Sequence, residues 1–296
     1  MKSRLVVAVA VLLVSGALGA SYYLFFIRPE RHVEAPPPPP PEVLRVSAAS
    51  GTVEVAGPDG VFHSVAPGAS LSAHDRIRTA DDGIAELRGA DGSTVKLLGA
   101  TVAGVSALSR ELKRLQLGKG MIEAEVKDDP ARLFEIELGD GAAARTRGAS
   151  FVASADGEGN AEVASRRGEV VLAAHGREVV IRAGQQARVR GAQPPEAPTP
   201  IPSSLFLKVN WPSAPTSQRR QIVTGTTAPG ARVQVNGRYV RVKADGTYTA
   251  EMELPDGQHQ LSVHAVDVGG HRRDEKSPSI TVDTQTNFKV NQPTWK

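Results

Sequence analysis

Apolar and polar residues alternate along most of the chain, in short runs that turn-forming residues separate. A period of two is the pattern of a β-strand that buries one face. It recurs from about residue 43 to residue 283, with glycines about every ten residues. Residues 102–117 also fit a helical period, and we interpret them as two strands joined by a polar bend at Ser109–Lys113. The pattern predicts an all-β fold.

The strongest local signal lies in residues 232–242. Asn236-Gly237 stands between two alternating segments, which is typical of a type I′ hairpin turn. A two-residue loop pairs Val235 with Arg238. The hairpin then has two faces, formed by Val233, Val235, Val240 and Val242 on one side and by Tyr239 and Arg241 on the other.

Two further strands follow, each introduced by an Asp-Gly turn at Asp245 and Asp256. Their expected buried faces are Tyr248, Ala250, Met252 and Leu254 in the first strand and Leu261, Val263 and Ala265 in the second. Such spacing predicts an antiparallel β-sandwich. The stretch "TGTTAPGARVQVNG…ADGTYTAEMELPDGQHQLSVHAVD" resembles bacterial immunoglobulin-like modules that accompany surface proteins and glycan enzymes. These residues imply a β-sandwich fold and do not indicate which ligand the module binds.

The N-terminus carries an uncharged segment, Leu5–Ile27, after the basic Met1–Arg4. As a helix it would measure about 34 Å, enough to span a hydrocarbon core of roughly 30 Å. A signal peptide cleaved near Gly19–Ser21 is the alternative, but the aromatic-rich end at Tyr22–Ile27 favours an uncleaved transmembrane anchor. We therefore expect a single-pass protein of the bacterial inner membrane with most of its chain in the periplasm.

Two proline-rich stretches divide the rest of the chain. The first contains six consecutive prolines, Pro36 to Pro41, which favour a semi-rigid polyproline II stalk. The expected parts are a cytoplasmic stub (1–4), the anchor (5–27), the stalk (28–42), a β-rich body (43–191), a linker (192–204), the immunoglobulin-like domain (205–284) and a tail (285–296).

The composition and charge of the chain argue against several classes of function. The net charge is only +3 and basic residues alternate with acidic ones, so no nucleic-acid surface is expected. The chain has no cysteine, which excludes disulfides, thiolate catalysis and cysteine zinc sites. Aromatic residues are only 4%, leaving few side chains to stack on sugars: Trp211, Tyr239, Tyr248 and Trp295.

The stretch "RTRGASF" offers the best candidate for catalysis, with Ser150 as a nucleophile beside Gly148. A serine nucleophile needs a base and an orienting acid, and none of the seven histidines lies in a catalytic motif. We instead interpret Ser150 as a solvent-side strand residue and Phe151 as core. Gly148 then permits a turn, and Arg147 pairs with a carboxylate or turn carbonyls.

No metal or cofactor site is expected. Asp156–Asn160 is a hairpin turn without the ligand series of a calcium loop, and His259 and His264 would face opposite sides of a strand. The adjacent pairs at Asp81 and Asp128 fit turns. The sequence thus contains no active site that we can identify, and we expect no enzymatic activity.

From about Leu44 to Val189 the order of these signals resembles the FecR domain, the periplasmic sensing module of bacterial cell-surface signalling regulators. The residues that carry the resemblance, as structural motif positions, are Asp91, Gly92, Ser93, Arg147, Gly148, Phe151, Gly168 and Gly184. The chain departs from the family at His74, where glycine is usual, and at Ala149, where threonine is usual. The expected fold of this body is β-rich, like a solenoid or a sandwich.

The resemblance implies a role in envelope sensing or signalling, in which the domain binds another protein, and addition of a strand to a sheet edge is the route we favour. Because only four residues precede the expected anchor, we expect a scaffold or accessory role rather than direct control of a sigma factor. The alternative is an envelope protein that binds peptidoglycan or another glycan.

Overall fold

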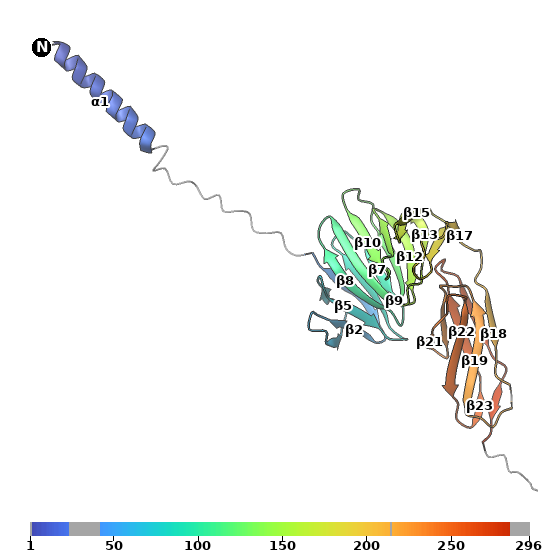
Figure 1. Ribbon diagram of the computed structural model, residues 1–296. Helices are drawn as coiled ribbons and strands as arrows, with labels where there is room; N and C mark the ends of the chain where they lie inside the picture. Colours follow the sequence, from blue (N-terminus) through green and yellow to red (C-terminus); the bar gives the residue numbers. More distant parts are fainter. Residues whose placement is uncertain (1, 24–41, 214, 285–296) are drawn as a thin grey trace, which may run out of the picture. The chain divides into compact units, whose positions relative to one another are not determined.

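The computed structural model describes residues 2–23, 42–213 and 215–284 of the 296-residue chain (Figure 1). Its contacts divide the chain between Pro40 and Pro41 into two units. The first contains the helix α1 (Lys2–Tyr22), and the second contains every strand of the described residues. The all-β prediction is confirmed for the second unit. The predicted stalk prolines and the tail lie outside the described residues.

The prediction of a single-pass inner-membrane protein was wrong. Within the described residues, no helix combines the length and the apolar character that a membrane span requires. The segment that we expected to span includes Gly16, Gly19 and four alanines among its valines and leucines, which lowers its hydropathy. Its aromatic end, residues 24–27, lies outside the described residues.

The body that follows Glu42 consists of two sheets that share one long strand. The first sheet has the strand order β4 (Ser70–Leu71), β1 (Leu44–Ser50), β6 (Ile84–Gly89), β7 (Thr94–Leu97), β9 (Leu112–Val126), β12 (Ala149–Ala155), β13 (Ala161–Gly168), β16 (Gln185–Val189) and β17 (Thr199–Pro200). All of these neighbours are antiparallel.

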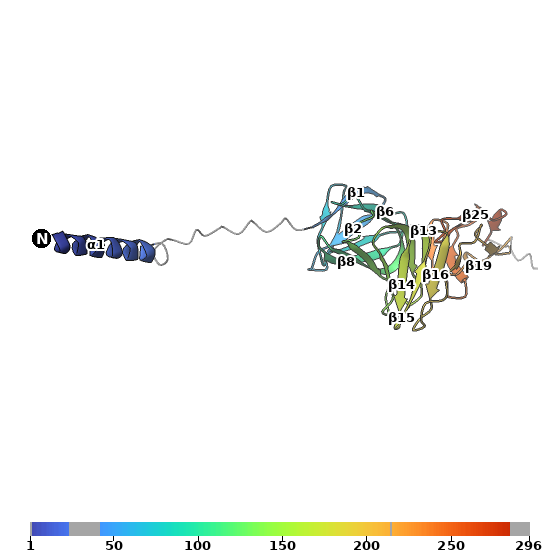
Figure 2. The same cartoon turned by 90° about the horizontal axis from the view of Figure 1, so that it is seen from above.

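The second sheet begins and ends with short strands. Its order is β3 (Phe62–Ser64), β2 (Val53–Ala56), β5 (Arg76–Thr79), β8 (Val102–Leu108), β9, β10 (Leu133–Glu137), β11 (Ala143–Thr146), β14 (Val170–Ala174) and β15 (Arg177–Ile181). The β9–β10 pair is parallel. Figure 2 shows β13 to β16 from above. The two strands and the bend predicted for residues 102–117 are confirmed.

Strand β9 joins the sheets because it changes partners along its length. Its first half pairs with β8 and β10, and its second half pairs with β7 and β12. The change falls at Gly120, whose φ of 112° is open to glycine and strained for other residues. One strand therefore contributes to both faces of the core.

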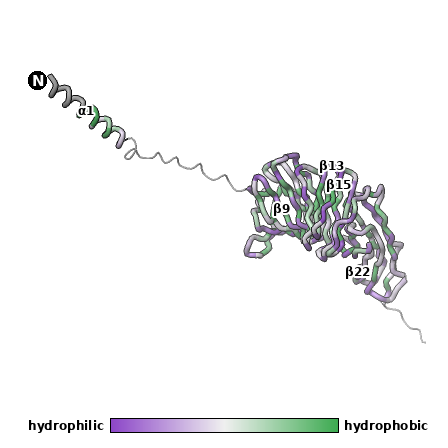
Figure 3. The backbone as a smooth tube through the Cα atoms, turned by 45° about the horizontal axis from the view of Figure 1, so that its top comes forward, coloured by the Kyte–Doolittle hydropathy of each residue, from purple (hydrophilic) through white to green (hydrophobic). Residues whose placement is uncertain are grey.

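The core of the body lies between these sheets. Its largest fully buried side chains include Phe134, Phe151, Leu71, Leu97, Leu117 and Ile136. Phe151 is 1% exposed, as predicted, and its ring meets that of Phe134 edge-on with centroids 6.2 Å apart. The tube coloured by hydropathy shows hydrophobic residues along the inner strands such as β13 (Figure 3).

The C-terminal module has a second core of its own, around Val223, Val233, Tyr248 and Leu261. Its sheets are β18 (Leu207–Asn210), β19 (Arg220–Thr227) and β22 (Thr247–Glu253); β21 (Arg238–Val240), β20 (Arg232–Val235), β24 (Ser262–Val266) and β25 (Arg272–Lys276); and the pair β23 (Gly257–His259) and β26 (Ile280–Val282). All pairs are antiparallel, as a sandwich requires.

The predicted hairpin is present with the expected register. Val235 pairs with Arg238 and Val233 pairs with Val240, and both turn residues, Asn236 and Gly237, have positive φ. Tyr248, Ala250, Leu261, Val263 and Ala265 are buried as predicted.

The proline-rich segment 192–204 is tied to the body at one point. Thr199 and Pro200 form β17, which pairs with Gln186 and Gln185 of β16. The next residue, Ile201, packs into a small apolar cluster described below. The segment therefore adds an edge strand to the first sheet.

Candidate functional site

The outer face of the β20–β21 hairpin contacts the body. Valines of β20 point into the module's own core, so the residues that alternate with them, Arg232 and Gln234, point outward. Arg232 donates a hydrogen bond to the Gly99 carbonyl at 2.6 Å, and Gln234 donates one to the Asp81 carbonyl at 3.2 Å. Polar side chains of the C-terminal module thereby cap backbone carbonyls in two loops of the body.

Tyr239, opposite Gln234 on the hairpin, completes this contact. The Arg232 guanidinium lies 4.2 Å from the centre of its ring, a cation–π geometry. A Cβ at Gly99 would lie 2.6 Å from Tyr239 Cε2, so the ring touches that loop directly. Burial lowers the pKa of Arg232 and raises the pKa of Tyr239. The contact is thus partly shielded from solvent.

A small apolar cluster forms a second contact. It contains Met121, Val152, Ala164, Val268, Leu98 and Ile201. Val152 is on the face of β12 opposite Phe151, yet it is fully buried. Its burial follows because Val268 of the C-terminal module packs in the same cluster.

The turn before β20 forms a third contact, against β12 and β13. The Ser154 hydroxyl donates a hydrogen bond to the Gly230 carbonyl at 3.2 Å. Gly230 has a φ of 80°, and a Cβ there would lie 2.0 Å from Glu162 Oε2. Arg241 and Glu158 form an ion pair at the rim.

These contacts enclose a cleft between the body and the C-terminal module, with a volume of about 330 Å³. Its apolar wall includes Val240, Val242 and the ring of Tyr239. Six basic side chains and two acidic ones line it: Lys119, Arg188, Arg190, Arg232, Arg241 and Lys243, with Asp156 and Glu162. The cleft therefore combines an apolar wall with a mostly basic lining.

Glu162 is the buried charge of this cleft. Its side chain is 5% exposed, and Arg188 Nη2 lies 2.9 Å from its Oε1. Burial raises the pKa of Glu162 to about 7, and the Arg188 charge only partly opposes that rise, while Asp267 and Glu196 add to it. Glu162 is therefore partly protonated near neutral pH.

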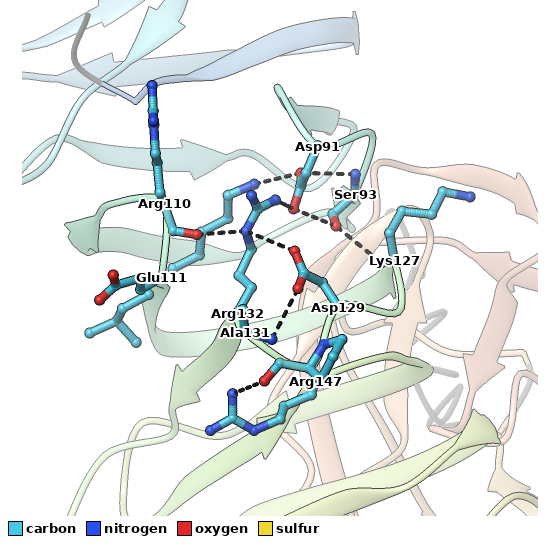
Figure 4. Close-up of polar contacts among 12 residues, drawn as sticks. Asp91, Ser93, Arg110, Glu111, Lys127, Asp129, Ala131, Arg132 and Arg147 are labelled. Carbon is cyan, nitrogen blue, oxygen red and sulfur yellow. Dashed lines mark hydrogen bonds and ion pairs between the residues drawn. The ribbon is translucent and has the colours of Figure 1, made fainter. Parts of the chain in front are cut away.

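The predicted motif residues Asp91, Gly92 and Ser93 lie elsewhere, in a turn between β6 and β7 (Figure 4). Asp91 accepts hydrogen bonds from the Ser93 N–H and hydroxyl, and Ser93 Oγ accepts one from the Lys127 N–H at 3.1 Å. Gly92 has a φ of 80°. The motif is a turn that also fixes the end of β9.

Two cations neutralise the Asp91 carboxylate. Lys113, only 1% exposed, and Arg132 each place a nitrogen 2.5 Å from one of its oxygens. Burial alone would raise the pKa of Asp91, but the bonds from these cations outweigh it and hold the pKa well below its usual value. Arg132 also bonds the Arg110 carbonyl. This network joins three loops and offers no open site.

The stretch around Gly148 is structural as well. Arg147 donates a hydrogen bond to the Pro130 carbonyl at 2.7 Å, one of the two partners expected from the sequence. Gly148 is needed for space rather than for a turn conformation, because a Cβ there would lie 2.0 Å from Asp128 Oδ1. Ser150 is half-buried and its side chain hydrogen-bonds Glu125. The nucleophile candidate thus faces a carboxylate.

The remaining family positions lie at turns. Gly168 and Gly184 have φ of 76° and 79°. His74, which replaces the usual glycine, has a φ of 75°, so the position demands the conformation that glycine adopts most easily. Asp156 accepts the Glu158 and Asn160 N–H groups, as a hairpin turn. The described residues contain no group of side chains suited to a metal ion.

Strand β15 is a free sheet edge. It pairs only with β14 among the described strands, and Val180 on its outer face is 42% exposed. Two other edges carry protective features: β17 of the body contains Pro200, and β25 of the C-terminal module consists of charged residues. Strand β15 therefore offers an edge of the body that another chain can reach.

The sequence did not reveal the cleft residues Glu162, Arg188 and Arg232. They stand in ordinary strand patterns, and the only local signal is the alternation of Arg232 and Gln234 with core valines. That alternation predicts an outward face but does not indicate what covers it.

Comparison with protein families gives two matches. The FecR protein family matches residues 75–171, and domain B of glucodextranase matches residues 208–286. No curated protein sequence matches the chain.

Solved structures show weaker likeness. A candidate anti-sigma factor from Parabacteroides distasonis is 19% identical, with a TM-score of 0.38, over 42% of this chain and 59% of that one. The fibronectin(III)-like modules of CbhA from Clostridium thermocellum are 15% identical, with a TM-score of 0.23, over 61% of this chain and 94% of that one. This chain spans about three fifths of the first structure, and neither likeness carries an argument about function.

The family match covers the centre of the body, including the Asp91 turn and the Gly148 stretch, and the second match covers the module with the Asn236-Gly237 hairpin. Residues 75–171 therefore form a FecR-type domain within the body, and the C-terminal module is similar to domain B of glucodextranase.

Proposed function

We propose that this protein is a non-enzymatic binding component of envelope signalling, and that the cleft between its two modules receives the signal molecule. The FecR domain supports the signalling role. The observation that carries the proposal is that both modules wall the cleft. An occupant would touch the FecR domain through Lys119 or Arg188 and the immunoglobulin-like module through Val242 or Lys243.

A ligand held by two modules changes how tightly they dock. It stabilises the docked arrangement by the difference between its affinities for the docked and undocked states. The polar contacts of Arg232, Gln234 and Ser154 are few, so a ligand that adds a few kcal/mol to the docked state can shift the docking equilibrium. Occupancy of the cleft would in this way alter the surface that the protein presents.

We propose that the partner which reads this surface is a protein of the envelope, bound by strand addition at β15. Alternate residues of an edge strand direct their N–H and C=O groups outward, where a partner strand can pair with them. The exposed Val180 supplies a side-chain contact on the same edge. Direct control of a sigma factor is not part of this proposal.

Photo-crosslinking in intact cells tests the proposal. A photoreactive residue in place of Val180 should yield one discrete adduct with an envelope protein, identified by mass spectrometry. The matched control is the same photoreactive residue in place of Val61, which is 52% exposed and lies just before β3, outside any strand. Ala244→Trp, which fills the cleft, should change the adduct yield. Equal adducts from both positions, or a yield indifferent to Ala244→Trp, would contradict the proposal.

The second candidate function is glycan binding. The match to domain B of glucodextranase and the position of Tyr239 on the cleft wall favour it. Of the other aromatic candidates, Tyr248 is 1% exposed and Trp211 packs against the module's core, while Trp295 lies outside the described residues. A pull-down on isolated peptidoglycan, beside one on solubilised membrane proteins, separates the two functions.

A further inference from the structure

We infer that the cleft takes a small anionic ligand that carries a carboxylate or a phosphate group. This inference rests on the proposed role of the cleft as the receiving site. Its volume of about 330 Å³ is at the small end of ligand pockets, which fits a molecule of the size of a monosaccharide or a dipeptide.

The charged residues that line the cleft favour a ligand with a negative charge. Lys119 of the FecR domain and Lys243 of the immunoglobulin-like module are both exposed at the cleft. Neither forms a salt bridge within the described part of the chain. Two ammonium groups, one from each module, attract an anion placed between them, and the low-dielectric walls of the cleft strengthen that attraction.

The acidic residues of the cleft do not cancel this preference. Asp156 is occupied within its own turn, where it accepts the Glu158 and Asn160 N–H groups and the Asn160 amide. Glu162 is paired with Arg188 and covered by Gly230. Because burial raises the pKa of Glu162 to about 7, part of the population carries no charge there at neutral pH.

The apolar wall of the cleft provides a surface for the uncharged part of the ligand. Tyr239, Val240 and Val242 are half-buried and all contribute to the lining of the cleft. A ligand with one anionic group and a compact body would place the charge between the lysines and the body on this wall. The arrangement matches the usual composition of small-molecule sites, in which a few polar groups orient a ligand on an apolar surface.

Isothermal titration calorimetry of the full chain with three probes tests the inference: D-glucuronate, inorganic phosphate and neutral D-glucose. We expect one or both anions to bind and glucose to bind at least about tenfold more weakly, since one favourable charge contact of about 1 kcal/mol approaches a factor of ten. Lys119→Gln with Lys243→Gln should weaken anion binding by about tenfold or more. Lys276→Gln, an exposed lysine on β25, should have no effect.

Each outcome decides a different point. Binding of phosphate alone or of glucuronate alone supports the inference and identifies the anionic group. Glucose binding as tightly as glucuronate, with both binding events lost in Ala244→Trp, overturns the anionic class but keeps the cleft as the site. Anion binding that Ala244→Trp leaves unchanged overturns the cleft itself, and with it the proposed function. No binding of either anion at about 10 mM overturns the inference, since weak small-ligand affinities lie in the millimolar range.

Discussion

The Glu162 carboxylate of the FecR domain lies directly against Gly230 of the immunoglobulin-like module. A Cβ at Gly230 would approach Glu162 Oε2 to 2.0 Å, so only glycine allows this approach. The pair joins a buried acid to the turn that closes one end of the cleft. The surfaces of the two modules are therefore complementary at this turn.

Gly230→Ala should therefore destabilise the protein and loosen its modules. Two costs add, the strained φ of 80° and the collision with Glu162. Gly237→Ala is the matched control, because its φ of 79° is the same but a Cβ there meets nothing within 4 Å. We expect Gly237→Ala to cost about 1 kcal/mol and Gly230→Ala about 1–3 kcal/mol more. Equal costs in urea denaturation would show that the modules do not meet at this turn.

Glu162 predicts a pH dependence of stability. Its pKa is about 7 in the folded chain and 4.5 is its ordinary value, so the folded state holds the proton more tightly. The tighter binding of this proton stabilises the folded state fully at pH values below about 4.5. The stabilisation decreases as the pH rises from about 4.5 to about 7 and is lost above that pH, with a total change in the free energy of unfolding of about 3 kcal/mol.

Glu162→Gln should remove that dependence. The free energy of unfolding of the variant should exceed that of the natural chain at pH 8.5 and approach it at pH 4.5, in urea denaturation at a series of pH values. Glu196→Gln, which alters a neighbouring and more exposed carboxylate, is the control and should keep most of the slope. The same slope in the natural chain and Glu162→Gln would refute the assignment.

Asp91→Ala should be among the most damaging changes to the FecR domain. It would leave Lys113, which is 1% exposed, as a buried charge without its carboxylate, at a cost of about 3–5 kcal/mol. The double variant Asp91→Asn with Lys113→Met removes both charges and should cost less than the sum of the single changes. Additive costs would mean that the two residues do not act as a pair.

Phe151→Ala should cost about 3–5 kcal/mol, because it removes a ring that packs edge-on against Phe134. Ser150→Ala should cost within about 0.5 kcal/mol, since its partner Glu125 lies at the surface. Thermal melts of the full chain rank the two. If Ser150→Ala abolished a measurable catalytic activity while stability stayed intact, the protein would be an enzyme.

Much of the fold was predictable because its signals are local. The register at Val235 and Arg238 follows from a two-residue Asn-Gly loop, and the burial of Phe151 follows from strand alternation. The space requirement at Gly148 was not predictable, because the atom that demands it, Asp128 Oδ1, lies 20 residues earlier in the chain.

The cleft was not predictable either, for a similar reason. Arg232 and Gly99 are bonded although more than a hundred residues separate them, and no local pattern encodes such a distance. Strand alternation assigns Val152 to the face opposite Phe151. It does not predict that Val268 of the C-terminal module covers this face. Membrane crossing was inferred from an apolar run whose described helix does not meet the requirement.

The central claim is that the two modules dock through Arg232 and Gln234 and so form one cleft. Because the chain has no cysteine, spin labels can be placed at Ser64→Cys in the body and Thr249→Cys in the immunoglobulin-like module, both exposed positions. Double electron–electron resonance should give one narrow distance distribution, which broadens when Arg232→Ala and Gln234→Ala are added. A distribution that is already broad in the labelled chain, and that these two changes leave as it is, would contradict the docked arrangement.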